Sequence, residues 1–317
     1  MNGLRRFQRI AVAGGGTSAE RTVSLNSQAA VVRALASRDY DVVAFDPAEQ
    51  PMNWLTEQSI DCVFNVLHGP GGEDGQLQGA LDTVGIAYTG CGVRGSALAM
   101  DKVVSKLLFR HHGLPTPEWH DLAGDADWPN DPGLGWPLFV KPASQGSSVG
   151  MNRVDEPADL AAAITAARAI ESRVMIERCL PGPEFTVSVL GRRVLPSIRI
   201  ETPNRFYDYD AKYEATTTEY ICPALSGQAE RTLGDLALAA FDALGCDGWG
   251  RVDFMTDSDG QPSIIEVNTV PGMTDHSLVP MAGAAVGLDF PSLCEAILDT
   301  VPRQRQTAPV MEGTYGR

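Results

Sequence analysis

Apolar and polar positions alternate most clearly within residues 248–278. Two runs there, 251–255 and 263–268, have the alternation of strands, and the residues between them, Thr-Asp-Ser-Asp-Gly, are a strong turn signal. The pattern predicts an antiparallel hairpin. Side chains along a strand alternate between its two faces, so one face is apolar and suited to a core, with Ile265 and Val267 on it. The opposite face carries Arg251 and three residues that are poor strand formers: Asp253, Glu266 and Asn268.

The polar face of this hairpin has the chemistry of a metal site. Asp253, Glu266 and Asn268 offer two carboxylates and an amide, which are hard oxygen donors. Mg²⁺ prefers such donors and is commonly held jointly by carboxylates and substrate phosphates. The hairpin therefore predicts a magnesium site with Arg251 beside it. The alternative is an ordinary hairpin with one solvated face, which the low strand propensity of these residues disfavours.

The first part of the chain alternates short apolar runs with helical patterns. Strands are expected at 10–13, 41–45, 60–67 and 86–89, and helices at 22–36 and 76–84. This alternation predicts an open parallel sheet with crossover helices. Ligands bind such sheets beyond the carboxyl ends of the strands. Glu20 and His68 lie in loops that follow strands, so both are candidate ligand contacts.

The glycine-rich loop after the first strand allows more than one interpretation. Residues 14–19 satisfy G-x-G-x-x-A, a weak form of the dinucleotide-binding pattern. Glu20 follows at once, and a carboxylate beside a helix N-terminus disfavours a pyrophosphate there. We interpret the loop as a tight turn that presents Glu20 to a ligand. A first-turn charge favoured by the helix dipole explains Glu20 equally well from its local sequence, and the position at the end of the sheet favours the functional role.

Three further segments carry polar chemistry. An amphipathic helix is expected over 96–112 and includes Lys102. A short strand runs directly into Lys141 and the Gly/Ser-rich loop 143–150, and an ammonium beside such a loop is suited to hold a phosphate. Residues 202–214 are polar, aromatic and aperiodic, and we interpret them as a lid.

Composition limits the class of partner. The chain has 317 residues, 44% hydrophobic and 21% charged, which is globular composition and enough for two or three domains. Its net charge of −15 argues against a nucleic-acid partner. The six cysteines form no C-x-x-C pair, and no apolar run suits a signal peptide or a membrane span. We therefore expect a cytoplasmic protein with reduced thiols and no membrane partner.

These motifs together resemble the D-alanine–D-alanine ligase family of the ATP-grasp superfamily. The matching stretches follow one collinear order over nearly the whole chain: GGGTSAERTVSLNS (14–27), HGPGGEDGQLQGALDTVGIAYTG (68–90), MDK (100–102), VKPASQGSSVGM (140–151), GPEFTV (182–187), LPSIRI (195–200), YDYDAKY (207–213), GWGRVDF (248–254) and EVNTVPGMTDHSLVP (266–280). The resemblance implies a three-domain α/β ATP-grasp fold with an N-terminal open parallel sheet. The expected domains are 1–96, 97–183 and 184–317, the last with a mobile loop at 202–219.

The resemblance also implies roles for individual residues. Two Mg²⁺ ions, for which Mn²⁺ can substitute, would be held by Asp253, Glu266 and Asn268. ATP would be bound by Lys102, Lys141, Ser148, Glu177, Glu184 and Lys212. The first D-alanine would meet Glu20 and His68, and Ser147 and Tyr213 would complete a hydrogen-bond network at the lid. An oxyanion site would be formed by Arg251 and Gly272, and the carboxylate of the second D-alanine would be bound by Ser277 and Leu278.

The implied activity is ATP-dependent joining of two D-alanines through a D-alanyl phosphate, for peptidoglycan precursors, by a homodimer. Three rival functions remain. Another ATP-grasp ligase with a different acid and amine is disfavoured by the joint presence of Glu20, Ser147 and Tyr213. A dinucleotide-dependent oxidoreductase gives the carboxylate hairpin no role. An inactive nucleotide-binding regulator would lack a metal carboxylate or a phosphate lysine, and none is missing.

Overall fold

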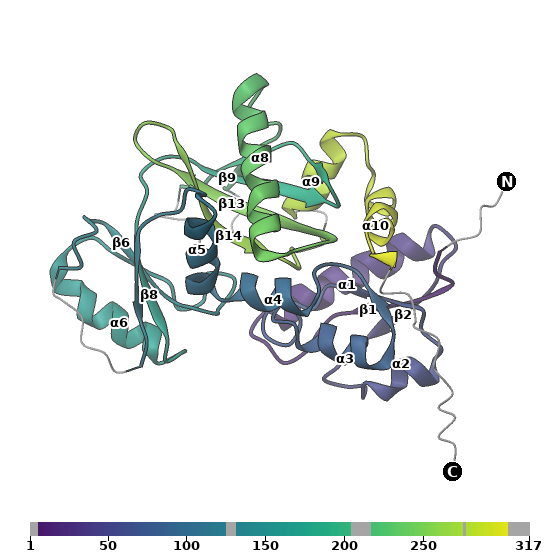
Figure 1. Cartoon of the computed structure of the whole chain (residues 1–317). Coiled ribbons are helices and arrows are strands. Elements are labelled where there is room, and N and C mark those ends of the chain that lie inside the picture. Colours follow the sequence, from purple (N-terminus) through teal and green to yellow (C-terminus); the bar gives the residue numbers. More distant parts are fainter. Residues whose placement is uncertain (1–5, 125–130, 204–216, 275–276, 304–317) are drawn as a thin grey trace, which may run out of the picture.

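The computed structural model describes residues 6–124, 131–203, 217–274 and 277–303, and three sheets follow one another along the chain (Figure 1). The first is parallel, with the strand order β2-β1-β3-β4, which confirms the expected open α/β sheet. Its strands are β1 (Arg9–Ala13), β2 (Asp41–Phe45), β3 (Cys62–Asn65) and β4 (Ala87–Tyr88). The helices that connect them are α1 (Arg21–Ala36), α2 (Asn53–Glu57) and α3 (Gln76–Val84).

The second sheet is antiparallel and lies on the far side of the molecule from the first (Figure 1). Its strands, in the order β5-β8-β6-β7, are β5 (Trp119–Leu122), β8 (Val174–Arg178), β6 (Leu138–Pro142) and β7 (Asn152–Val154). The 3-10 turn η1 (Pro157–Asp159) and helix α6 (Leu160–Arg168) follow β7, and α6 covers one face of the sheet. Lys141 on β6 is opposite Met175, and Glu177 on β8 is opposite Phe139, so Lys141 and Glu177 are diagonal neighbours on one face of the sheet.

The third sheet has six strands and contains the predicted hairpin. They are β9 (Glu184–Leu190), β10 (Arg193–Val194), β11 (Ile198–Glu201), β12 (Glu219–Ile221), β13 (Trp249–Thr256) and β14 (Pro262–Asn268). Helix α8 (Gly227–Leu244) packs on the apolar face of the sheet, where Val252, Phe254 and Val267 are buried. The hairpin is confirmed, and three of the four residues predicted on its apolar face, Val252, Phe254 and Val267, are buried.

The helix expected over 96–112 is two helices, α4 (Val93–Met100) and α5 (Lys102–His111). The chain is extended at Asp101, whose carboxylate accepts a hydrogen bond from Val104 N at 2.9 Å and so caps α5. The amphipathic pattern continues through the break, which is why it predicted one helix. The break places Lys102 in the first turn of α5, where Lys102 N donates to Ala143 O.

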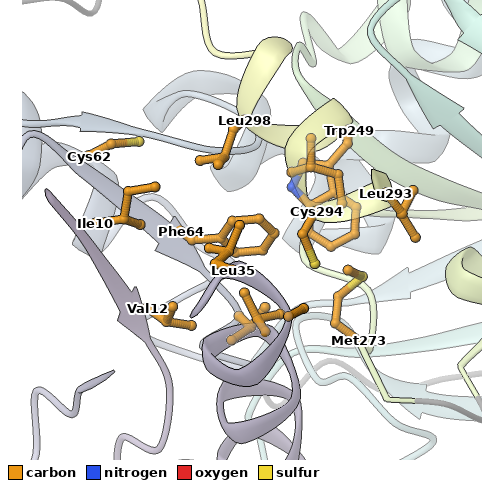
Figure 2. Packing of buried hydrophobic residues seen from close by; sticks show 14 of the residues in the cluster. Ile10, Val12, Leu35, Cys62, Phe64, Trp249, Met273, Leu293, Cys294 and Leu298 are labelled. Atoms are coloured by element: carbon orange, nitrogen blue, oxygen red, sulfur yellow. The ribbon is translucent and has the colours of Figure 1, made fainter. Parts of the chain in front are cut away.

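The core of the first sheet extends to the C-terminal helices α9 (Leu278–Ala285) and α10 (Phe290–Asp299). Figure 2 shows Phe64 of β3 and Leu35 of α1 facing Cys294 of α10 and Trp249 of β13. The ring centroids of Phe64 and Trp249 are 6.3 Å apart. This shared core fixes the parallel sheet against the third sheet, so that the loops at one end of the first face the polar side of the hairpin.

Within the described ranges, no single helix is long and apolar enough to cross a membrane. Helices α9 and α10 have the length and apolar composition of a membrane span only when they are counted together, and the chain bends by 99° between them.

Candidate active site

Two adjoining cavities, of about 620 and 630 Å³, meet at Lys102, Gly146, Ser147 and Glu266. The first lies between the second and third sheets and is lined by residues that include Lys141, Ser148, Glu177, Glu184 and Asp253. The second lies between α1 and the segment after β14, and its lining includes Glu20, His68, Arg251, Asn268, Gly272, Ser277 and Leu278. The structure thus divides the candidate site residues between two neighbouring spaces.

The polar face of the hairpin is organised by its register. Asp253 pairs with Glu266, and Arg251 pairs with Asn268, directly across the ladder. Both oxygens of Asp253 accept hydrogen bonds from the Arg251 guanidinium, each at 2.7 Å. Thr186 Oγ1 on β9 donates to Asp253 Oδ1 at 2.6 Å. The carboxylate is therefore fixed from two sides and faces Glu266.

This donor set fits a hard divalent cation. Among the described residues no three His, Cys, Asp or Glu side chains cluster as metal ligands, so a third protein donor would be the Asn268 amide. Asn268 Oδ1 accepts a hydrogen bond from Val270 N at 3.1 Å, which orients the amide. Two opposed carboxylates with an amide oxygen suit Mg²⁺ that completes its shell with phosphate oxygens.

One prediction about the hairpin was wrong. Ile265 was placed on the core face, but it lines the first cavity together with Glu266. The register shifts between Asp253 and Phe254, so that Asp253 pairs with Glu266 and Phe254 with Ile264. The extra residue is Ile265, and a β-bulge of this kind turns side chains away from strict alternation. Ile264 takes the buried position instead.

The described lysines converge at the first cavity. Lys102 Nζ donates to Gln145 O at 2.7 Å and lies 3.3 Å from Glu266 Oε2. Lys141 Nζ donates to Glu177 Oε2 at 2.6 Å, and Lys106 Nζ contacts the other oxygen of Glu177. Burial by itself would raise the pKa of the Glu177 carboxyl, and the two ammonium groups hold that pKa below its usual value.

The Gly/Ser-rich loop connects the two cavities. Ser147 and Ser148 have φ of 48° and 60°, in the left-handed region that residues other than glycine rarely adopt. Such strain tends to concentrate at ligand sites. Ser147 Oγ donates to Glu20 Oε1, across 127 positions of sequence. A Cβ on Gly146 would lie 3.1 Å from Glu20 Oε2, so this glycine permits the close approach.

Glu20 lies at the N-cap position of α1 but makes no capping hydrogen bond with its side chain, and it is largely buried. Its carboxylate faces the second cavity and the Ser147 hydroxyl. The backbone of the preceding glycine loop is already in contact with a carboxylate, where a dinucleotide site would bind a pyrophosphate. Asp46 Oδ1 accepts from Gly16 N at 2.9 Å, and a Cβ on Gly15 would lie 2.3 Å from Asp46 Oδ2. The dinucleotide interpretation is therefore disfavoured.

His68 joins the N-terminal sheet to the segment after β14. Its Nδ1 lies 2.9 Å from Val270 O, a carbonyl that can only accept, so Nδ1 carries a proton. Ser27 Oγ accepts from Met273 N at 3.1 Å and lies 3.2 Å from His68 Nε2. These bonds hold the backbone on both sides of Gly272.

The far end of the second cavity is the start of α9. Ser277 is the N-cap of that helix, and Thr274 N donates to Ser277 Oγ at 2.9 Å. A Cβ on Gly272 would lie 3.0 Å from Ser277 Oγ, so the glycine keeps the hydroxyl accessible. Leu278 begins α9 and is buried. Helix N-termini favour anions, which suits a carboxylate here.

Some of the expected site lies outside the described residues, namely Lys212, Tyr213 and most of the loop 202–219. Sequence reasoning also missed three contacts that the structure shows: Thr186, Lys106 and Ser27. Thr186 is two positions from Glu184 and therefore on the same strand face, and Lys106 is one helical turn from Lys102. These spacings could have indicated both. The local sequence around Ser27 gives no comparable signal.

Comparisons with known proteins agree with this geometry. Residues 46–91 match the family model described as D-ala D-ala ligase N-terminus, and residues 108–299 match D-ala D-ala ligase C-terminus. The D-alanine–D-alanine ligase B of Chromobacterium violaceum is 48% identical over 300 residues, covering 94% of this chain and 99% of that protein. The D-alanine–D-alanine ligase of Chromohalobacter salexigens is 51% identical over 298 residues, covering 93% and 95%.

Solved structures show the same relationship. The D-alanine–D-alanine ligase of Bacillus anthracis complexed with ATP has a TM-score of 0.83 and 33% identity, covering 94% of this chain and 98% of that one. The VanG D-Ala:D-Ser ligase of Enterococcus faecalis has a TM-score of 0.77 and 28% identity, covering 93% and 99%. The chain therefore belongs to the D-alanine–D-alanine ligase family.

Proposed function

We propose that this chain joins two D-alanines into D-alanyl-D-alanine, with ATP and Mg²⁺, for peptidoglycan synthesis. The observation that carries the proposal is the meeting of two cavities at Lys102, Ser147 and Glu266. One cavity has the lysines and carboxylates that a metal-bound nucleotide requires, and the other has groups for a zwitterionic amino acid. Their junction is where a carboxylate would meet the γ-phosphate.

The nucleotide would occupy the first cavity. Lys102 and Lys141, with Lys212 from the loop 202–219, would contact its phosphates, and Ser148 would donate a further hydrogen bond. The strand that carries Glu177 would face the adenine through its backbone, and Glu184 would contact the ribose. Asp253, Glu266 and Asn268 would hold the Mg²⁺ ions against the phosphates. The ions would neutralise charge that develops in phosphoryl transfer, a reaction that depends mainly on positioning and electrostatics.

The amino acids would occupy the second cavity. Glu20 would accept hydrogen bonds from the ammonium of the first D-alanine, near His68, and Ser147 would connect Glu20 to Tyr213. The N-terminus of α9, with Ser277 and Leu278, would bind the carboxylate of the second D-alanine. Arg251 and the backbone at Gly272 would stabilise the oxyanion. This assignment places Glu20, Arg251 and Ser277 of the cavity wall beside charged groups of the substrates, and Ser147 beside Glu20.

The chemistry follows in two steps. The carboxylate of the first D-alanine attacks the γ-phosphate, which forms an acyl phosphate and releases ADP. The amine of the second D-alanine attacks the acyl carbon, a tetrahedral oxyanion forms near Arg251, and its collapse releases phosphate and forms the peptide bond. Water would hydrolyse the acyl phosphate, so enclosure of the site by the loop 202–219 would protect the intermediate.

The architecture and the cellular setting form part of the same proposal. The three sheets support domains at 1–96, 97–183 and 184–317, with the nucleotide between the last two. We further propose a cytoplasmic homodimer. Light scattering on purified protein tests the oligomeric state, and a monomer at micromolar concentration would overturn it.

An ADP-release assay with a panel of D- and L-amino acids tests the function. We expect ADP release to require D-alanine and Mg²⁺, and mass spectrometry to identify D-alanyl-D-alanine as the product. D-Serine or D-lactate as the preferred second substrate would overturn the specificity while leaving an ATP-grasp ligase. No amino-acid-dependent ADP release would overturn the function as a whole.

A further inference from the structure

Lys106 is a buried cation that the proposed chemistry does not use. Its side chain is 0% exposed, and its ammonium contacts Glu177 Oε1. The other oxygen of Glu177 accepts from Lys141 Nζ at 2.6 Å, and Glu177 itself is 2% exposed. The three charges therefore form one row. Lys141 and Glu177 line the first cavity, and Lys106 lies behind them, out of reach of a nucleotide.

Further contacts hold Lys106 on the side that faces away from the cavity. Its Nζ donates to Thr116 Oγ1 at 2.7 Å, and the Thr116 hydroxyl uses its single proton to donate to Ile264 O at 2.8 Å. The ammonium also lies 5.5 Å from the ring centroid of Trp119, a favourable cation–π position. Each partner either attracts a cation or accepts a hydrogen bond from it. The surroundings of Lys106 therefore suit a positively charged hydrogen-bond donor.

The composition of the chain points to the same residue. Of its 25 basic residues 21 are arginine, and the four lysines are Lys102, Lys106, Lys141 and Lys212. Three of these four are proposed phosphate contacts. Lys106 is the remaining one, and it reaches the same site through Glu177. The ammonium of Lys106 has three donors and meets three oxygens, those of Glu177, Thr116 and Pro117.

The net charge of Lys106, Glu177 and Lys141 indicates a function for Lys106. Lys141 and Glu177 alone would form a neutral pair, and the attraction of Lys141 for a phosphate would be largely cancelled. With Lys106 the row carries one net positive charge, and Lys141 is the member at the cavity. The charged groups that surround Lys106 are Glu177 on β8, Lys141 on β6 and, farther away, Glu266 on β14.

We propose that Lys106 is a positioning residue for ATP: it neutralises Glu177, so that Lys141 presents an uncancelled positive charge to the phosphates. The inference rests on the proposed function, because it assumes that Lys141 meets ATP. It adds a residue that touches no substrate and acts through another side chain.

Lys106→Met tests the inference by removing the charge while it retains most of the volume. We expect the Kd for ATP with Mg²⁺, measured by calorimetry without amino acid, to rise about tenfold, the effect of weakening one charged hydrogen bond. The KM for ATP should rise in parallel, with the KM for D-alanine unchanged. Arg192→Met is the matched control, because it removes one exposed charge distant from the site and should alter neither constant.

The double variant Lys106→Met/Glu177→Gln separates positioning from a structural role. Glu177→Gln keeps the backbone that would face the adenine and removes only the carboxylate that binds Lys141. Lys141 is then freed again, so the double variant should bind ATP within about threefold of wild type. It also decides the case if Lys106→Met fails to fold, because it leaves no buried carboxylate that has lost one of its two ammonium partners. The ammonium that remains, Lys141, lines the cavity. A single variant that binds ATP as wild type does, or a double variant that binds ten times more weakly than wild type, would overturn the inference. If wild type itself fails to bind ATP, the proposed function fails instead.

Discussion

At the scale of single residues, the proposed metal site depends most on Glu266, which lies opposite Asp253 and 3.3 Å from Lys102. Glu266→Gln keeps the shape of the side chain and removes one charge. We expect ADP release to fall by about 100-fold or more, because even groups that only orient a metal ligand contribute roughly 10–100-fold. Thermal unfolding checks that the variant is folded. Near wild-type turnover at saturating Mg²⁺ would contradict the metal assignment.

Arg251 makes a second prediction at this scale. Its guanidinium binds both oxygens of Asp253 and lines the second cavity. Lysine is a point charge and cannot reproduce this planar fork. For Arg251→Lys we expect kcat to fall by roughly 10²–10³, the usual effect of losing one oxyanion donor. Steady-state kinetics distinguish the alternatives, since a higher KM with unchanged kcat would mean that Arg251 only binds the ground state.

At the scale of elements, Asp101 separates α4 from α5 and connects both to the second sheet. Its carboxylate caps α5 and also accepts from Arg173 Nη1 at 2.8 Å. We expect Asp101→Ala to lower the free energy of unfolding by about 1–2 kcal/mol, the sum of a lost cap and a partly exposed ion pair. Asp101→Asn retains the cap and should lose less than half as much. Urea unfolding measures both, and equal losses would show that capping does not matter here.

Local sequence patterns predicted helices and strands better than they predicted the breaks and bulges within them. The alternation of strands and helices gave the parallel sheet, and the polar and apolar faces of the hairpin gave Asp253 and Glu266 as neighbours. The bulge at Ile265 and the break at Asp101 were missed, because hydrophobic periodicity continues through both. Each arises from a contact that periodicity does not record, a shifted ladder in one case and a side-chain cap in the other.

Local sequence patterns predicted even less of the candidate site, because its contacts join residues that are far apart in the chain. Ser147 meets Glu20 across 127 positions, and Lys102 of α5 meets Glu266 of β14. No local spacing predicts such pairs. The contact of Ser147 with Glu20 was anticipated only through resemblance to a family, and the contact of Lys102 with Glu266 was not anticipated. Lys106 was missed because its role depends on a carboxylate that lies far along the chain.

At the scale of the whole molecule, the core shared by the first sheet and α10 decides whether the second cavity keeps its shape. Cys294 lies inside this core and is 0% exposed. Burial raises the pKa of its thiol to about 12, because a thiolate there would lose its hydration. The thiol therefore stays mostly protonated in the folded protein until the pH approaches that value, whereas in the unfolded chain it titrates near 9.

This difference predicts how stability depends on alkaline pH. Between about pH 9 and 12 the unfolded state binds fewer protons at Cys294 than the folded state, so stability falls as pH rises. This one group should lower the free energy of unfolding by about 1.4 kcal/mol between pH 8 and pH 10. Cys294→Ala should be less stable at pH 8 but should lose less on going to pH 10. Urea unfolding of both proteins across the pH series measures the two slopes, and parallel slopes would show that the core opens to solvent around Cys294 before the molecule unfolds.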